Sequence, residues 1–281
     1  MMREIKVSEI TGAIRDMCIE ANLRLSGDMK EALLAAENEE TSENGKHILR
    51  KLQENLDIAC ADEIPICQDT GMAVVFLEAG QDVHFAGGPL EDAVNEGVRL
   101  GYTEGFLRKS VVDDPLLRKN TGDNTPAVIH ERIVEGDRVK ITLAPKGFGS
   151  ENMSRIFMLK PAEGIEGVKN AILTAVKDAG PNACPPMVVG VGIGGDFEKA
   201  AILAKEALTR KADDASELPH IRALEEELKG LINQTGIGPG GLGGRITCLA
   251  VKINTYPTHI AGLPVAVNIC CHVNRHITRE L

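Results

Sequence analysis

The chain has 281 residues, of which 43% are hydrophobic and 26% are charged, as in an ordinary soluble globular protein. Its formal net charge of −10 opposes nucleic-acid binding, which needs a concentrated basic surface. The longest apolar runs are well short of the ~20 residues that a membrane helix requires, and the N-terminus lacks the apolar segment of a signal peptide. We therefore expect a cytoplasmic protein that binds neither nucleic acid nor membrane.

Residues 5–60 are predicted to be helical. Apolar residues recur every three or four positions in VSEITGAIRDMCIEANLRL, with Ser8 as the expected N-cap. Two further helices are expected at 28–40 and 41–63, before Pro65 closes the region.

Strand and helix patterns alternate after Pro65. Residues 125–147 predict a hairpin, because two β-rich runs flank a turn at 135–137. Other strands are expected at 72–80, 187–195, 245–257 and 263–271, and other helices within 87–106 (opened by Pro89) and at 165–180, 196–210 and 218–236. The predicted fold class is α/β (mixed α+β), with a helical N-terminal layer packed on an α/β body that has a mixed sheet. We expect one domain, 1–281, made of a helical region at 1–62 and the body at 63–281.

The run GVGIGG at 190–195 matches the glycine pattern of dinucleotide-binding proteins and lies between a predicted strand and a predicted helix. The acidic residues near the required spacing, Asp213 and Asp214, follow a helix and do not end a second strand. A turn in which two backbone segments approach closely is the better interpretation, although NAD binding stays an alternative.

The seven cysteines are odd in number and widely scattered, which argues against a disulfide framework in a cytosolic chain. Cysteines in such a chain are more often inert core residues than functional ones. This is the expectation for Cys18 on a helix face, for Cys248 within a strand and for Cys60.

Three cysteines have unusual surroundings. They are Cys67 in PICQDTG, Cys184 in AGPNACPPM and Cys271 in NICCHVNR. Nearby prolines would hold the first two in rigid turns, where thiolates suit a soft metal or an iron–sulfur cluster. Three ligands would leave one iron of a [4Fe–4S] cluster without a protein ligand, free to act as a Lewis acid. Cys67 as the nucleophile of a Cys-His-Asp hydrolase, beside Asp69, remains open but lacks a supporting motif.

The chain resembles the α subunit, or N-terminal domain, of the class I iron–sulfur fumarase and L-tartrate dehydratase family. The similarity rests on several long motifs in the same order. They are ICQDTG (66–71), LRKSVVDDPLLRKNTGDNTPAVIH (107–130), LAPKGFGSEN (143–152), GPNACPPMVVGVGIGGDFEKA (180–200), THIAGLPVAVN (258–268) and the CHVNR ending.

This resemblance implies a [4Fe–4S] cluster with one iron not ligated by protein, held by Cys67, by Cys184 and by Cys271 or its neighbour Cys270. The spacing after the V-A-V-N run matches Cys271. The resemblance also implies that Asp69 takes part in acid–base chemistry, together with a Thr of another domain or subunit. The residues expected to contact a dicarboxylate substrate are Gln68, Asp69, Arg108, Gly147, Gly149 and His259, with weaker support from Arg118, Lys119 and Lys146.

The expected activity is that of the α subunit of a hydro-lyase that interconverts fumarate and (S)-malate, with L(+)-tartrate dehydratase as the alternative. A non-catalytic cluster protein, such as an electron carrier, would be expected to have four protein ligands and no substrate pocket. The chain ends ten residues after Cys271. We therefore expect a separate β subunit carrying the C-terminal fumarase domain, a heterotetramer or larger assembly, and no activity of the chain alone.

Overall fold

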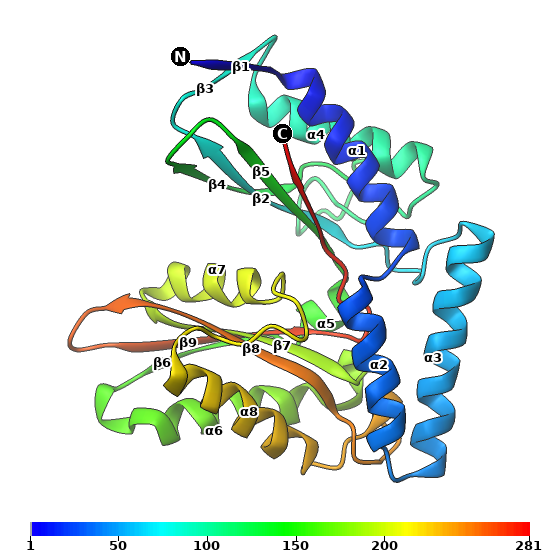
Figure 1. The fold of residues 1–281 in the computed structure, drawn as a ribbon, viewed down its shortest axis with the longest axis vertical. Coiled ribbons are helices and arrows are strands. Elements are labelled where there is room, and N and C mark those ends of the chain that lie inside the picture. Colours follow the sequence, from blue (N-terminus) through cyan, green and yellow to red (C-terminus); the bar gives the residue numbers. More distant parts are fainter. Residues whose placement is uncertain (1) are drawn as a thin grey trace. The chain divides into compact units, whose positions relative to one another are not determined.

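The computed structural model describes residues 2–281, and the contacts within the chain divide it into two compact units (Figure 1). Unit 1 comprises the chain up to Ser26, Leu56–Phe148 and Arg275–Leu281. Unit 2 comprises Gly27–Asn55 and Gly149–Asn274. Both contain helices and strands, so the predicted α/β class is confirmed.

Unit 1 is built on a four-stranded sheet with the strand order β10-β5-β2-β4, beside a two-stranded parallel sheet of β1 and β3. Its elements are β1 (Arg3–Lys6), α1 (Val7–Leu23), β2 (Met72–Gly80), β3 (Val83–Ala86), α4 (Leu90–Glu104), β4 (Val128–Val134), β5 (Val139–Lys146) and β10 (Ile277–Glu280). Helices α1 and α4 pack on the sheet through side chains at helical spacing. The buried core includes Ile10, Ile14, Met17, Val75, Leu77, Val94, Val98, Tyr102, Ile141 and Leu143.

The predicted hairpin at 125–147 is wrong. Strands β4 and β5 both exist, but β2 lies between them, parallel to β4 and antiparallel to β5. The reason is the relative apolarity of the three strands. Strand β2 contains a run of five buried residues and takes a central place, whereas no residue of β4 is buried and β4 lies at the edge.

Unit 2 is a sheet with the order β6-β9-β7-β8 and helices on both faces. Its elements are α2 (Gly27–Glu39), most of α3 (Glu43–Asp62), β6 (Arg155–Leu159), α6 (Gly164–Ala179), β7 (Met187–Gly195), α7 (Phe197–Ala207), α8 (Pro219–Asn233), β8 (Cys248–Thr258) and β9 (Leu263–Cys270). Short helices are α5 (Phe148–Glu151), η1 (Pro161–Glu163), η2 (Gly180–Ala183) and η3 (Pro239–Gly241).

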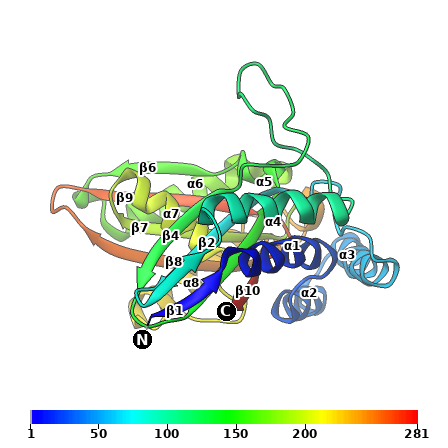
Figure 2. The same ribbon diagram turned by 90° about the horizontal axis from the view of Figure 1, so that it is seen from above.

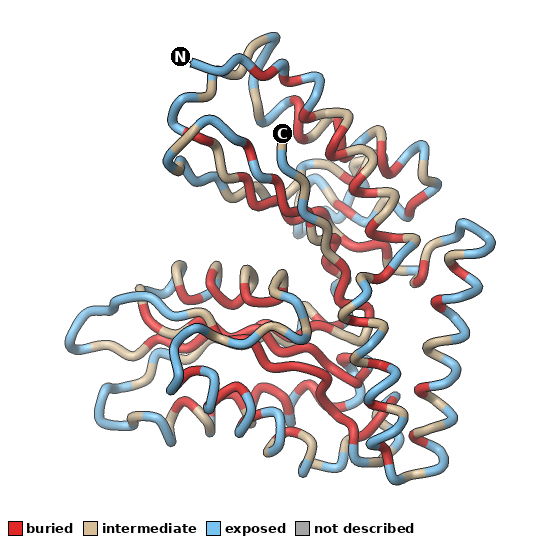
Figure 3. Tube along the Cα trace, viewed as in Figure 1, coloured by how far each residue is buried: buried red, intermediate tan, exposed pale blue. Residues whose placement is uncertain are grey.

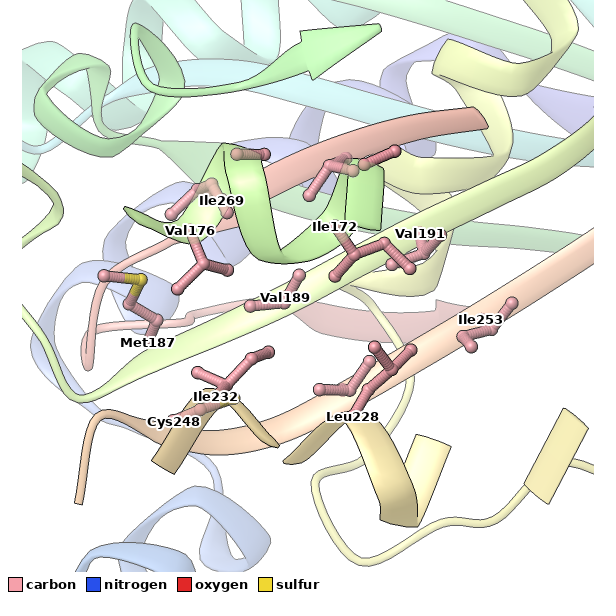
Figure 4. Close-up of a cluster of buried hydrophobic side chains, with 14 of the residues drawn as sticks. Ile172, Val176, Met187, Val189, Val191, Leu228, Ile232, Cys248, Ile253 and Ile269 are labelled. Atoms are coloured by element: carbon pink, nitrogen blue, oxygen red, sulfur yellow. The ribbon is translucent and has the colours of Figure 1, made fainter. Parts of the chain in front are cut away.

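The core of unit 2 lies between the sheet and helices α6 and α8. Figure 4 shows Ile172 and Val176 of α6 and Leu228 of α8 around Val189 of β7. Strands β7, β8 and β9 form the most continuous buried stretch of this unit, while its helices are exposed on their outer sides (Figure 3). Each fully buried Val, Ile or Leu contributes about 1.5–3 kcal/mol to this packing.

The opposite face of β7 explains the glycine run at 190–195. Val189 and Val191 point into the α6–α8 core, so Gly190 and Gly192 face the other way, toward α7. A Cβ atom added at Gly192 would lie 2.0 Å from the Ala200 carbonyl oxygen of α7. The helix therefore packs its backbone directly on the strand.

The N-terminus of α7 is already occupied by an anionic side chain of the protein. Asp196 is its N-cap and accepts a hydrogen bond from the Lys199 N–H at 2.9 Å. Close backbone packing therefore accounts for the glycine run, and this geometry does not favour NAD binding.

The three N-terminal helices, β2, and the strands and helices predicted after residue 164 are confirmed within a few residues. Ser8 is not an N-cap, because α1 begins at Val7 with Lys6 as its cap.

The division between the units does not follow the expected boundary near residue 62, since α1 belongs to unit 1 and α2 to unit 2. The single-domain description stays a prediction. No helix within residues 2–281 is long and apolar enough to cross a membrane.

The glycines give a direct test of this packing. Gly192→Ala should lower the free energy of unfolding by about 1–3 kcal/mol, because the methyl group meets the backbone of α7. Gly12→Ala is the control, since nothing lies within 4 Å of a Cβ added there within α1, and it should raise stability by about 0.5–1 kcal/mol. Urea denaturation measures both, and equal effects of the two substitutions would contradict the packing argument.

Candidate active site

The segment Ile64–Gly71, named here the Cys67 loop, joins α3 to β2 in unit 1. Two buried side chains hold its end. The Tyr102 hydroxyl lies 2.8 Å from the Thr70 carbonyl oxygen and 2.9 Å from that of Gly71. The Asn124 amide donates to the same Gly71 carbonyl at 3.1 Å. Both side chains are fully buried, so the loop has a defined position.

Asp69 is oriented by the backbone on both sides of it. Its Oδ1 accepts from the Gly71 N–H at 3.1 Å, and its Oδ2 accepts from the Phe148 N–H at 2.8 Å. A Cβ atom added at Gly147 would lie 3.2 Å from Oδ2. The structure therefore brings together Asp69 and Gly147, which are far apart in the sequence.

Arg108 is attached to the same loop through its backbone. The Arg108 N–H donates to the Thr70 hydroxyl at 3.0 Å, and this hydroxyl lies 3.2 Å from the Arg108 carbonyl oxygen. The guanidinium group is exposed and has no hydrogen bond or ion pair within residues 2–281. An exposed, unpaired guanidinium whose backbone is bonded to Thr70, next to Asp69 in the chain, suits a carboxylate ligand.

Cys67 and Gln68 complete this part of the site. The Cys67 Sγ lies 3.3 Å from the Gln68 Oε1, and the Gln68 side chain is exposed. Arg118 and Lys119 are exposed on the long loop between α4 and β4, which extends away from the sheet in Figure 2, whereas Lys146 is buried. Unit 1 thus gathers Cys67, Gln68, Asp69, Arg108 and Gly147.

Two of the predicted ligands lie at one end of the unit 2 sheet. Cys184 lies three residues before the start of β7, and Cys271 directly follows β9. The two strands are antiparallel, with Val188 opposite Cys270, so the start of β7 meets the end of β9. The His272 Nδ1 also lies 3.1 Å from the Cys184 carbonyl oxygen.

The burial of the cysteines separates accessible thiols from core residues. Cys184 is exposed and Cys271 is partly exposed, whereas Cys270 is buried within β9. Burial raises the pKa of the Cys248 thiol to about 12 and also raises that of Cys18, so neither forms a thiolate readily. The core interpretation of Cys18 and Cys248 is confirmed, and accessibility favours Cys271 over Cys270 as a ligand.

Gly149 lies near the cysteine end of unit 2. It belongs to α5, whose Glu151 accepts from the Asn268 amide of β9 at 2.7 Å. Nothing lies within 4 Å of a Cβ added at Gly149, so its backbone is open to a ligand.

His259 does not lie at that end. It is exposed in the turn between β8 and β9, and its Nδ1 accepts from the Ala261 N–H at 3.1 Å. The adjacent Thr258 is opposite Gly195, at the far end of β7. The eight residues of β9 separate this turn from Cys271 by roughly 25 Å. The structure therefore does not bring His259 together with Cys184 and Cys271 of the same chain.

Three residues that the sequence did not assign hold the Cys67 loop: Tyr102, Asn124 and Arg275. Arg275 is 4% exposed and donates to the backbone oxygens of Pro145 and Asp69. Its Nη1 is buried and has no hydrogen-bond acceptor within residues 2–281. The only sequence signal for Arg275 was its place in the CHVNR motif.

Within residues 2–281, no group of three His, Cys, Asp or Glu side chains is arranged to hold a metal ion. Cys67 belongs to unit 1, and Cys184 and Cys271 belong to unit 2. The ligand atoms nevertheless fit a metal group bound by thiolates, because the two accessible thiols of Cys184 and Cys271 lie at the same end of one sheet. In unit 1, the buried Nη1 of Arg275 is a hydrogen-bond donor without an acceptor within residues 2–281.

A cavity of about 540 Å³ in unit 2 contains none of the predicted residues. The basic residue of its lining, Arg210, is already paired with Asp214 and Glu225. This cavity is therefore separate from the chemistry described above.

The sequence profile of the family described as Fumarate hydratase (Fumerase) matches residues 11–280. This chain belongs to the fumarase family. A Methanocaldococcus jannaschii protein with the provisional name L(+)-tartrate dehydratase subunit alpha is 41% identical over 279 residues, covering 97% of this chain and 98% of the relative. The L(+)-tartrate dehydratase subunit alpha of Escherichia coli K12 is 30% identical over 275 residues, covering 97% and 90%. The fumarase-family resemblance inferred from the motifs is thus confirmed.

The two tyrosines of this fumarase-family chain test the support of the Cys67 loop. Tyr102→Phe should lower the free energy of unfolding by about 1–3 kcal/mol, because it leaves the Thr70 carbonyl without this donor at nearly unchanged side-chain shape. Tyr256→Phe is the control, because Tyr256 is 54% exposed and should change stability by less than about 0.5 kcal/mol. Urea denaturation distinguishes them, and a neutral Tyr102→Phe would show that these contacts do not hold the loop.

Proposed function

We propose that this chain is the α subunit of an iron–sulfur hydro-lyase that acts on a four-carbon hydroxydicarboxylate. L(+)-tartrate is the first candidate substrate, because the relatives that match nearly the whole chain carry that name. This choice reverses the order of preference drawn from the sequence. Fumarate and (S)-malate form the second candidate pair, favoured by the description of the family whose profile matches.

The observation that carries the proposal is the arrangement around Asp69. Its carboxylate is held by two backbone N–H groups, the backbone of the exposed Arg108 is bonded to the adjacent Thr70, and Cys67 lies two residues earlier in the same loop. A carboxylate for proton transfer and a cation for a substrate carboxylate are the two functions that water elimination from a hydroxyacid needs.

The proposed cofactor is a [4Fe–4S] cluster held by Cys67, Cys184 and Cys271, with one iron not bound by protein. When bound, such a cluster supplies a Lewis acid for the departure of a substrate hydroxyl. The accessibility of Cys184 and Cys271 supports this ligand set.

The proposed roles of the chain's own residues follow from their positions. Asp69 exchanges the proton on the carbon next to the hydroxyl-bearing carbon. That proton is weakly acidic in a carboxylate dianion, so a nearby cation must stabilise the developing charge. Arg108 is the exposed candidate for this contact, and Gln68, Gly147 and Gly149 supply polar groups that orient the substrate.

The proposed partner is a separate β subunit that carries the C-terminal fumarase domain, in a heterotetramer or larger assembly. The names of the relatives, which specify a subunit alpha, support this partner. No disulfide joins the seven cysteines, which all lie within residues 2–281, and this fits the reducing environment of the cytoplasm as the proposed location.

Substrate choice is tested with the chain purified anaerobically together with its β subunit. We expect release of oxaloacetate from L(+)-tartrate to exceed turnover of fumarate and (S)-malate, and no turnover by the chain alone. Faster turnover of fumarate and malate would favour the second candidate. Activity of the chain alone would contradict the two-subunit proposal, and the absence of activity on all three compounds would contradict the hydro-lyase proposal.

Substitutions separate the role of Asp69 from that of the cysteines. Asp69→Asn should lower kcat by about 10²–10⁴-fold, because the amide cannot exchange the proton, while bound iron is retained, because Tyr102 and Asn124 still hold the end of the loop. Cys184→Ser should lose both bound iron and activity. Cys60→Ser is the matched control and should change neither. Iron and sulfide analysis beside the activity assay is the measurement, and full iron content in Cys184→Ser would contradict the ligand assignment.

A further inference from the structure

The glycine-rich run Gly238–Gly244, named here the glycine loop, has no role in the proposed chemistry. It packs against the turn that carries Cys184. The Gly240 N–H donates to the Pro185 carbonyl oxygen at 2.8 Å. A Cβ atom added at Gly241 would lie 2.3 Å from the Pro181 Cβ, so the two segments touch directly. The glycine loop therefore packs directly against the Cys184 turn and forms a hydrogen bond with it.

The Cys184 turn needs such support because of its backbone conformation. Cys184 has φ of +52° and lies in the left-handed region, which is unfavourable for a residue with a Cβ. Strained conformations of this kind cost about 1–3 kcal/mol and persist only where the surrounding structure imposes them. The position of the thiol therefore depends on how firmly the neighbouring loop is held.

A buried carboxylate holds the end of the glycine loop. Glu40 is 2% exposed and lies in the junction between α2 and α3. Its Oε1 accepts from the Arg245 N–H at 2.9 Å, and its Oε2 accepts from the Ile246 N–H at 2.8 Å. Oε1 also accepts from the N–H groups of Thr41 and Ser42, each at 2.8 Å.

The surroundings of Glu40 favour its ionised form and leave it no room to move. Burial by itself raises the pKa of a carboxyl, but the four backbone donors outweigh that effect and the pKa of Glu40 is lowered from its ordinary value. Cβ atoms added at Gly45 and Gly244 would lie 2.8 and 2.9 Å from its side-chain atoms. Glu40 is thus an anion fixed between two chain segments.

We propose that Glu40 is a positioning residue for the Cys184 thiol. Its carboxylate fixes residues 244–246, these fix the glycine loop, and the glycine loop imposes the left-handed turn at Cys184. The importance of that thiol rests on the proposed function, but its geometry can be measured without any bound cofactor.

The test compares two adjacent glutamates, Glu40→Gln and Glu39→Gln, because Glu39 is exposed. In Glu40→Gln an amide group faces backbone donors and at least one hydrogen bond is lost. Amide hydrogen exchange of the metal-free, full-length chain should then be about tenfold faster at residues 182–187 and 238–247. Exchange in the turn at 258–262 should be unchanged, and Glu39→Gln should match the unsubstituted chain throughout.

A role in overall stability alone gives a different result. In that case exchange would increase throughout β7, β8 and β9, and the buried Cys248 would react with N-ethylmaleimide; this outcome would overturn the proposal. Unchanged exchange at 182–187 would also overturn it.

Thr247→Val is a second variant should Glu40→Gln fail to fold, because the Thr247 Oγ1 accepts from the Gly238 N–H at 3.0 Å at the other end of the glycine loop. It should accelerate exchange at the same residues.

Iron retention in the holoenzyme with its β subunit separates this proposal from the proposed function. Faster iron loss in Glu40→Gln than in Glu39→Gln supports both. Faster exchange at residues 182–187 with unchanged iron retention supports the positioning role of Glu40 and contradicts Cys184 as a cluster ligand.

Discussion

The buried hydroxyl group of Tyr102 fixes the end of the Cys67 loop, together with the Asn124 amide and the Arg275 guanidinium. A buried phenol requires an acceptor, and its acceptors are the carbonyl oxygens of Thr70 and Gly71. The loop therefore cannot shift without leaving polar groups unsatisfied, at a cost of about 1–3 kcal/mol. Asp69 and the backbone of Arg108 are tied to the same residues, so the orientation of the candidate acid–base group follows from this contact.

Unit 2 uses the same physical principle with a charged group. Glu40 accepts four backbone hydrogen bonds and secures the segment that leads into the glycine loop, just as Tyr102 secures the end of the Cys67 loop. In both units the candidate site residues Asp69 and Cys184 lie in loops, and a buried polar side chain from a distant part of the sequence binds the loop or its support. This arrangement suits thiols and carboxylates that must remain accessible and yet keep a fixed position.

Local charge is the second constraint on the site. The chain carries a formal net charge of −10, which opposes the approach of a dianion. The charged groups near Asp69 differ from this net negative charge. Within residues 2–281, Arg108 is exposed and unpaired, and the buried Arg275 donates only to backbone oxygens. A buried cation without a carboxylate partner is costly, so its place behind the Asp69 backbone fits a site that binds anions.

The sequence by itself determined the α/β class, most helices and strands, the family and the candidate residues Cys67, Asp69, Arg108 and Cys184. These depend on short-range periodicity and on motifs, which are local properties. Only the tertiary structure decided that β2 separates β4 from β5, since strand order depends on which strand can be buried on both sides. It also decided that Cys270 is buried whereas Cys271 is accessible, and that His259 lies a strand's length away from them. Tyr102 and Glu40 could not be recognised from the sequence, because a buried polar side chain is identified by the distant backbone groups that it binds.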